Sequence, residues 1–281
     1  MGLGILIVAF NSPLRELAAR SLQEELYSHV LLVPFVSAYL MWIRRKEFLP
    51  GRTWDFPQAL IAAATGFSIL IGYSAAVLFG GGVSGNDRLS LLMFSFVCLV
   101  GALGLALMGR ENVRVTAFPL GLLLLMVPFP GIVLDGITTF LQLASAEATY
   151  GLIKLSGTPV FRDGLVFTLP GMTPIEVAAE CSGIRSTLVL FITGLIGGQM
   201  FLMRPSGKWW LAAATIFIGI LRNGFRILAL VLLSIHVDSG IIDSSLHHRG
   251  GPIFFLISLV PLLGLLVLMR KWERRSQPGA C

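Results

Sequence analysis

The chain has 281 residues, of which 55% are hydrophobic and 13% are charged, whereas about 25% of the residues in a soluble domain are charged. This composition excludes a soluble globular protein. Lys and Arg outnumber Asp and Glu by 21 to 15. The basic residues gather in short clusters between long apolar runs, which is typical of a membrane topology signal and unlike the basic face that nucleic-acid binding requires.

Apolar runs recur along the chain at the length that a bilayer demands, since about 20 helical residues cover a hydrocarbon core of about 30 Å. We predict seven transmembrane helices, over residues 27–43, 58–79, 89–109, 115–134, 186–203, 209–235 and 252–269. A shorter apolar run at residues 2–10 has no preceding basic region and ends at a polar stretch. We expect an uncleaved anchor or half-span there, as a candidate eighth helix.

Basic residues fall in alternate loops between these spans. They are Arg44, Arg45, Lys46, Arg52, Arg110, Arg114, Arg204, Lys208, Arg270, Lys271, Arg274 and Arg275. Because Lys and Arg are retained on the cytoplasmic side, we predict that these loops lie inside. Residues 80–88, 136–185 and 236–251 are then predicted to lie outside.

The long outer segment contains two structures that we expect not to span the bilayer. Polar residues recur at helical spacing on one side of residues 136–155: Thr138, Thr139, Gln142, Ser145 and Thr149. This pattern predicts an amphipathic helix at the outer interface. A spanning helix is the alternative, but it would place the basic loop at Arg204 and Lys208 outside. Residues 157–179 change to short β-branched and aromatic runs separated by turns, which predicts a small β-rich cap.

The predicted fold is therefore an all-α polytopic membrane protein with seven to eight transmembrane helices, an amphipathic interfacial helix and a small β-rich cap on the outer face. The chain shows no internal repeat or low-complexity tract. We expect a single domain over residues 1–281, with the outer cap at about residues 136–183.

Arg222, Asn223 and Arg226 lie inside the predicted span 209–235. An ionisable group within a span costs at least about 2.5 kcal/mol, so these residues should face the bundle or an outward cavity. At a rise of about 1.5 Å per residue both arginines fall in the outer half of the membrane, and their spacing of four puts them on one helix face. Alternatively, Arg226 extends to the outer headgroups and Arg222 closes a structural ion pair.

Cys181 stands immediately before the predicted span 186–203. Ser182 is a candidate N-cap, and both the helix N-terminus and Arg185 favour a thiolate, whereas Glu180 opposes it. A small apolar packing role is the alternative for this thiol.

His247 and His248 occupy the predicted outer loop before the last span. Imidazole titrates near neutrality and can move a proton from a thiol to a leaving amine. A solvated interfacial histidine is the alternative for at least one of them. The four histidines and three cysteines lack the spacing of a zinc motif or a disulfide framework, so we predict no metal and no cofactor.

The predicted topology places Cys181, Arg226 and His247 at the outer face of three successive helices. A thiol nucleophile, an arginine that stabilises a thiolate or oxyanion, and a proton carrier together make an acyl-transfer site. We predict attack on a peptide carbonyl, a thioester intermediate, and its resolution by water or another nucleophile.

Three sequence blocks resemble the exosortase and archaeosortase family of polytopic membrane cysteine proteases or transpeptidases. They are Glu180-Cys181-Ser182-Gly183-Ile184-Arg185-Ser186, Asn223-Gly224-Phe225-Arg226-Ile227, and His247 four residues before Gly251. The resemblance covers residues 27–269 and is of the bacterial exosortase type. It implies Cys181 as the nucleophile, Arg226 as the catalytic arginine and His247 as the catalytic histidine, with no assigned role for Arg222. The doublet leaves the register open by one residue, so His248 is the alternative.

The resemblance also implies a partner and a location. The substrates would be secreted proteins that end in a short Pro-containing motif such as PEP, an apolar helix and a basic tail. The enzyme would lie in the bacterial inner membrane with its site facing the periplasm, and the substrate helix would dock beside it. A different class stays open, namely a transporter or lipid-handling protein whose buried arginines bind an anionic substrate.

Overall fold

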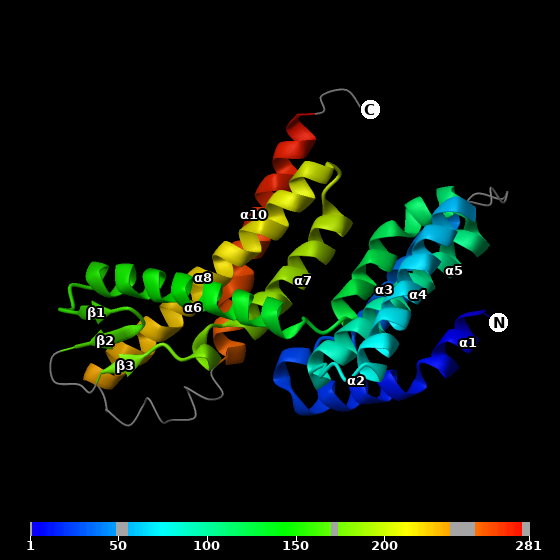
Figure 1. Ribbon diagram of the computed structural model, residues 1–281. Coiled ribbons are helices and arrows are strands. Elements are labelled where there is room, and N and C mark those ends of the chain that lie inside the picture. Colours follow the sequence, from blue (N-terminus) through cyan, green and yellow to red (C-terminus); the bar gives the residue numbers. More distant parts are fainter. Residues whose placement is uncertain (1, 49–55, 170–173, 237–250, 277–281) are drawn as a thin grey trace. The chain divides into compact units, whose positions relative to one another are not determined.

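The computed structural model describes residues 2–48, 56–169, 174–236 and 251–276 (Figure 1). Its contacts group the chain into two compact units, which we call unit 1 (Met1–Leu134) and unit 2 (Asp135–Cys281). The single domain expected from the sequence stays a prediction.

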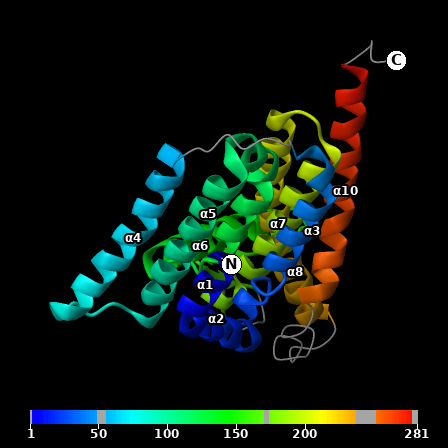
Figure 2. The same ribbon diagram turned by 90° about the vertical axis from the view of Figure 1, so that its right-hand side faces the viewer.

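Unit 1 is helical throughout its described residues. Its helices are α1 (Gly2–Ala9), α2 (Asn11–Gln23), α3 (Val33–Ile43), α4 (Phe56–Leu78) and α5 (Gly85–Leu122), with the short 3-10 helices η1 (Glu25–Tyr27), η2 (Arg44–Glu47) and η3 (Leu123–Met126). Both α3 and α4 pack against α5, and Figure 2 shows α4 beside α5. Helix α5 breaks at Gly109, whose φ of 76° and ψ of 165° are conformations that only glycine adopts readily. The break coincides with the predicted loop between two spans.

Five helices among the described residues are long and apolar enough to cross a membrane: Phe56–Leu78, Gly85–Gly109, Ile184–Phe201, Pro205–Ile235 and Gly251–Arg275. The number rises to as many as seven if each of two bent helix pairs is one span. The polytopic all-α membrane class is thereby confirmed. The count of seven to eight spans stays a prediction.

The first predicted span, residues 27–43, differs from the structure. Helix α3 has 11 residues and begins at Val33, with Pro34 in its first turn, where the fixed φ of proline favours a helix start. Residues 28–32 form turns instead. A helix of this length is about 16 Å long, which is too short for the hydrocarbon core.

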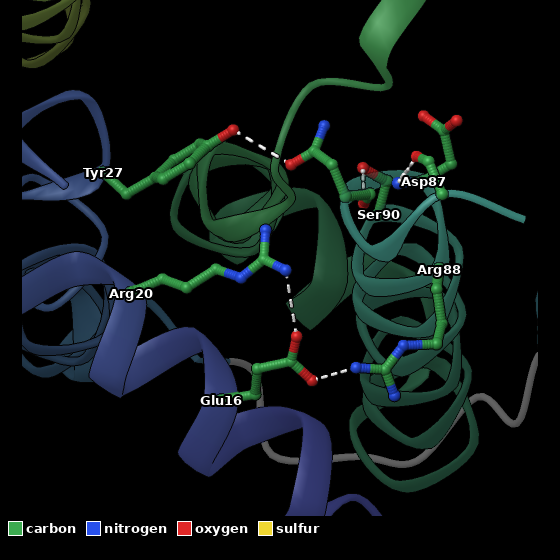
Figure 3. A network of polar contacts seen from close by, with 8 residues as sticks. Glu16, Arg20, Tyr27, Asp87, Arg88 and Ser90 are labelled. Atoms are coloured by element: carbon green, nitrogen blue, oxygen red, sulfur yellow. Dashed lines mark hydrogen bonds and ion pairs between the residues drawn. The ribbon is translucent and has the colours of Figure 1, made fainter. Parts of the chain in front are cut away.

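One end of unit 1 holds a network of polar side chains (Figure 3). Glu16 on α2 pairs with Arg20 at 3.1 Å and also with Arg88 on α5. The Tyr27 hydroxyl donates to Oδ1 of Asn86 at 3.1 Å. These contacts tie α2 and η1 to the start of α5.

The same end of α5 fastens the segment that leads into the next helix. Asn86 Nδ2 donates to the carbonyl of Phe129 at 2.6 Å, and Ser90 Oγ donates to the carbonyl of Pro128 at 2.7 Å. The backbone N–H of Gly131 donates to Asp87 Oδ1 at 2.7 Å. The first turn of α6 (Gly131–Leu155) is therefore held by side chains of α5.

Unit 2 combines helices with a small antiparallel sheet. After α6 come β1 (Phe161–Asp163), β2 (Val166–Thr168), β3 (Ile175–Glu176), η4 (Ala179–Cys181), α7 (Ile184–Phe201), α8 (Pro205–His236) and α10 (Gly251–Arg275). The strand order is β1-β2-β3, with Phe161 opposite Thr168 and Val166 opposite Glu176. A small sheet therefore forms where the turn signals predicted strands, and its place on the outer face stays a prediction.

Two apolar clusters hold unit 2 together. One cluster joins α6, the sheet and the C-terminal half of α8, through Ala146, Ile153, Phe167, Leu169, Val177, Leu228 and Val231. The other joins α7, α8 and α10, through Leu190, Leu202, Leu211, Leu262 and Leu266. In Figure 1 the sheet lies along α6, while α7, α8 and α10 form a bundle. Helix α8 contributes to both clusters and so links the sheet to the bundle.

The polar stripe of α6 turns inward over most of its length. Ser145 and Thr149 are fully buried, and Gln142 Nε2 donates to the carbonyl of Val177 at 2.5 Å. The apolar residues Phe140 and Leu143 are instead 58% and 47% exposed. The place of this helix at the outer interface stays a prediction, and the structure packs much of its polar side against protein. The reason is that backbone carbonyls of the packed sheet and turn accept hydrogen bonds from this stripe.

Candidate functional site

Cys181 lies on a tight turn between the sheet and α7. The 3-10 helix η4 ends at this residue, and α7 begins at Ile184. Between them, Gly183 adopts the left-handed region, with a φ of 76° and a ψ of 13°. A Cβ at Gly183 would lie 2.8 Å from Cγ of Asn223, so both the backbone angle and the close approach require glycine.

The expected N-cap role of Ser182 is wrong. The N-cap position of α7 belongs to Gly183, and no side chain in the described part of the chain caps this helix end. Ser182 has helical backbone angles at the end of η4, whereas an N-cap residue typically has extended ones. Its Oγ is buried and has no hydrogen-bond partner among the described residues. The Ser182 hydroxyl, next to Cys181 in the chain, is thus a buried polar group that makes no hydrogen bond to the described residues.

Asn223 on α8 connects two of the sequence blocks described above, residues 180–186 and residues 223–227. Its Nδ2 donates to the backbone carbonyl of Cys181 at 2.7 Å. The side chain is 1% exposed, and its Oδ1 has no hydrogen-bond partner among the residues that the structure describes. The Asn223 amide nitrogen therefore fixes the backbone of Cys181, while the amide oxygen Oδ1 accepts no hydrogen bond from the described residues.

Helix α6 supports this junction from a third direction. Ser145 Oγ donates to the carbonyl of Ser182 at 3.5 Å. A Cβ at Gly224 would lie 2.8 Å from Cβ of Ala148 and 3.1 Å from the backbone N of Thr149, so α6 and α8 touch there. This role of α6 was not predicted from the sequence. The signals that could have shown it are Gly224 within the predicted span 209–235 and the small residues Ser145, Ala148 and Thr149, which recur at helical spacing on α6.

The two arginines of α8 lie on either side of Asn223. Arg226 is half-buried and stands about one helical turn further along. Arg222 is 6% exposed, and its Nε and Nη2 atoms have no hydrogen-bond partner in the described part of the chain. The structural ion pair considered for Arg222 is not found among these residues. Two cationic residues therefore flank the asparagine that contacts the Cys181 turn.

The remaining predicted site residues have different outcomes. His247 and His248 lie outside the described residues. Cys181 is half-buried. Within the described ranges, no three His, Cys, Asp or Glu side chains are grouped so that they could hold a metal ion. The structure therefore brings Cys181, Ser182 and Asn223 together and places Arg222 and Arg226 on the same stretch of α8.

A thiol on such a junction is suited to nucleophilic chemistry. In general, a helix N-terminus favours the thiolate form of a cysteine beside it, and the thiolate is the reactive form. Buried donors beside it can stabilise an oxyanion as it develops. The turn at Cys181 is therefore the candidate functional site.

Comparison with known proteins gives a family for the chain. The family described as transmembrane exosortase matches residues 21–264, which is well over half of the chain. The matched range includes the turn at Cys181, the arginines of α8 and the histidine doublet. No curated protein and no solved structure matches the chain.

Proposed function

We propose that this chain, which belongs to the transmembrane exosortase family, cleaves the C-terminal sorting signal of secreted proteins through a cysteine thioester. Membership makes it a membrane protein of the class of protein-sorting proteases or transpeptidases. The proposal adds the nucleophile, the helper residues and the side of the membrane on which they act.

The observation that carries the proposal is the hydrogen bond from Asn223 to the Cys181 carbonyl, 2.7 Å long. It connects a thiol at a helix start to the helix that bears Arg222 and Arg226. A nucleophile needs a fixed position as well as a favourable charge environment. The glycine turn at Gly183 and the amide of Asn223 supply the first requirement, and the helix dipole and arginines supply the second.

The proposed reaction has two halves. The Cys181 thiolate attacks the carbonyl carbon of the scissile peptide, a C–S bond forms, and Arg226 stabilises the negative charge on the carbonyl oxygen. As the C–N bond breaks, His247 or His248 gives a proton to the leaving amine. Water or an amine then attacks the thioester, the C–S bond breaks, and the histidine accepts the proton that the attacking group loses.

We place this reaction on the periplasmic side of a bacterial inner membrane. The distribution of Lys and Arg supports this orientation, because the basic clusters flank the ends of the spans opposite to Cys181. The partners are then secreted proteins whose short Pro-containing motif reaches Cys181 while their apolar helix stays in the bilayer. If the substrate helix docks beside the enzyme within the bilayer, recognition depends on where the motif is held relative to Cys181.

The test is processing of a secreted reporter that ends in a motif, an apolar helix and a basic tail. Co-expression with Cys181→Ala should abolish cleavage, and Arg226→Ala should slow it by about 100-fold to 1000-fold. One of His247→Ala and His248→Ala should have a comparable effect. Cys98→Ala is the matched control, because that thiol lies in α5 of unit 1. Full processing by Cys181→Ala would end the proposal.

A second function is supported by the burial of Arg222. A transporter or lipid-handling protein would use such a cation to bind an anionic substrate within the membrane. Alkylation of Cys181 separates the two functions, because a transporter tolerates a blocked thiol and a cysteine peptidase does not.

A further inference from the structure

An apolar groove runs along α5 between α1 and α4, within unit 1. Its volume is about 420 Å³. Helix α1 forms one wall, the first turns of α4 form the other, and the turns of α5 before the break at Gly109 form the floor. Every lining residue is apolar, and several are small, among them Ala59, Ala63, Ala102 and Ala106. The groove therefore suits an apolar ligand.

The groove is open to the membrane along its edges. Ile5 on α1 and Leu60 on α4 both line it and are exposed. One end is closed where α4 touches α5. There a Cβ at Gly66 would lie 3.0 Å from Cγ of Leu99, and Ser95 Oγ donates to the carbonyl of Gly66 at 2.9 Å. Because α4 and the first part of α5 are both long and apolar enough to span a bilayer, a ligand enters the groove from the hydrocarbon region.

The opposite end of the groove lies beside η2. Ala106 lines the groove, and a Cβ at Gly104, two residues earlier, would lie 4.0 Å from Cγ2 of Val113. Two residues after Val113, the carbonyl of Val115 accepts a hydrogen bond from Arg44 Nη1 at 3.1 Å. Because Arg44 is the first residue of η2, this contact holds η2 at the same end of α5 as Ala106.

This end of unit 1 carries exposed cations, which we call the basic cluster: Arg45, Lys46 and Arg114. Two carboxylates stand among them, Glu47 and Glu111, and Glu111 approaches Arg114 only to 3.9 Å. The cations outnumber the carboxylates, so this end attracts anions. An apolar groove that leads from the hydrocarbon region to a cationic surface is complementary to a lipid with a negative headgroup.

We propose that the groove binds one acyl chain of an anionic phospholipid whose phosphate contacts the basic cluster. On the orientation expected from the basic loops, this lipid belongs to the cytoplasmic leaflet. A transmembrane helix is the other candidate ligand, but ten residues of a helix about 10 Å wide occupy about 1200 Å³, well above the 420 Å³ of the groove. A helix that ends in a basic tail would also bring like charges together.

The test uses the full chain in nanodiscs of phosphatidylcholine that contain a small fraction of a photoreactive lipid. This lipid carries a diazirine on one acyl chain, and its headgroup is either phosphatidylglycerol or phosphatidylcholine. After irradiation, peptide mass spectrometry locates the labelled residues. The anionic lipid should label residues 59–63 and 99–106 about fivefold more than the neutral lipid does. Ile71, on the exposed side of α4, should be labelled equally by both.

Filling the groove tests the place of the acyl chain. Ala106→Phe should reduce labelling of residues 59–63 to about the level at Ile71, because the new ring occupies the space of the chain. Ala64→Phe is the matched control, since Ala64 is an exposed residue of α4 outside the groove, and its labelling should equal that of the wild type. If Ala106→Phe fails to fold, Ala63→Leu takes its place from the opposite wall.

Removing charge tests the place of the phosphate. The double variant Lys46→Gln and Arg114→Gln should bring the ratio of anionic to neutral labelling close to one. Arg15→Gln is its control, because it removes an exposed cation from α2, and the ratio should stay at the wild-type value. The thermal unfolding midpoint reports whether each variant is folded.

Three outcomes overturn the inference. Equal labelling of the groove by both lipids would mean ordinary contact with the bilayer. Unchanged labelling in the groove-filling variant would place the acyl chain elsewhere. Crosslinking of the reporter's apolar helix to residues 99–106, with loss of lipid labelling, would assign the groove to a peptide. None of these readouts involves cleavage, so the proposed function stands or fails separately through Cys181→Ala.

Discussion

Polar side chains are buried at two places in this protein, and the two places differ in how far those groups are satisfied. In unit 1, Tyr27, Asn86 and Ser90 all have hydrogen-bond partners (Figure 3). In unit 2, Ser182 Oγ, Asn223 Oδ1 and two nitrogens of Arg222 have none among the described residues. Buried polar groups are normally paired. Exceptions are expected at functional sites, where stability is given up for chemistry.

This contrast separates two kinds of variant. Changes in the network of unit 1 should lower the free energy of unfolding and leave the chemistry of the folded protein intact. Changes around Cys181 should lower the cleavage rate and have a small or even favourable effect on stability. Four substitutions test the contrast, in order of decreasing effect.

Gly183→Ala should cause the largest change. The new Cβ would meet Asn223 Cγ at 2.8 Å in a backbone with a φ of 76°, so the turn that carries Cys181 must shift. A displacement of about 1 Å costs about 100-fold in rate. Gly157→Ala is the control, because Gly157 has the same φ but open space around it. Equal cleavage rates for the two variants would show that the contact with Asn223 does not position the thiol.

Asn223→Ala should slow cleavage by about tenfold, because it removes the hydrogen bond to the Cys181 carbonyl. The comparison variant is Asn86→Ala, which removes the contacts to Tyr27 and Phe129 in unit 1. Asn86→Ala should lower the free energy of unfolding by about 1–3 kcal/mol and leave the rate per folded molecule unchanged. Thermal unfolding in detergent and reporter cleavage give the two values. The opposite pattern would abolish the distinction between the units.

Arg222→Met should stabilise the protein by about 1 kcal/mol or more, because it replaces an unbalanced buried charge with an apolar side chain of similar length. The measurement is the unfolding midpoint without substrate. Arg88→Met is the matched variant and should destabilise, since Arg88 contacts Glu16. A destabilised Arg222→Met protein would mean that Arg222 has a structural partner.

Glu16→Gln should have the smallest effect, a loss of about 0.5–1 kcal/mol of stability, because its two ion pairs are partly exposed. The loss should shrink as salt is added. Glu111→Gln is the control, since its pair with Arg114 is 3.9 Å long and well exposed. No effect of Glu16→Gln at low salt would show that this part of the network contributes nothing to stability.

Much of the fold could be predicted because long apolar runs and glycine turns act locally. The runs that form α4, α7 and α10 need no partner to be recognised as helices. The break in α5 follows from Gly109 beside a basic cluster, and the β1–β2 hairpin follows from the Asp163-Gly164 turn.

The errors have a different cause, since they concern which neighbour a residue meets. The polar stripe of α6 was recognised from its spacing, but the pattern does not reveal that Ser145 and Thr149 contact protein. Ser182 was assigned to the N-cap, but the left-handed turn at Gly183 takes that position. The sequence identified Arg222 as costly, yet only the structure shows that its charge is left unbalanced among the described residues.

The most direct test of the account is to detect the acyl group on the thiol. The full chain in detergent is mixed with the reporter, quenched in acid during turnover and analysed by mass spectrometry. We predict a fragment of the reporter attached to Cys181 through a bond that hydroxylamine breaks, and no such adduct on Cys181→Ala. Complete cleavage of the reporter, with Cys181 unmodified at every time point and no loss of rate in Cys181→Ala, would contradict the account.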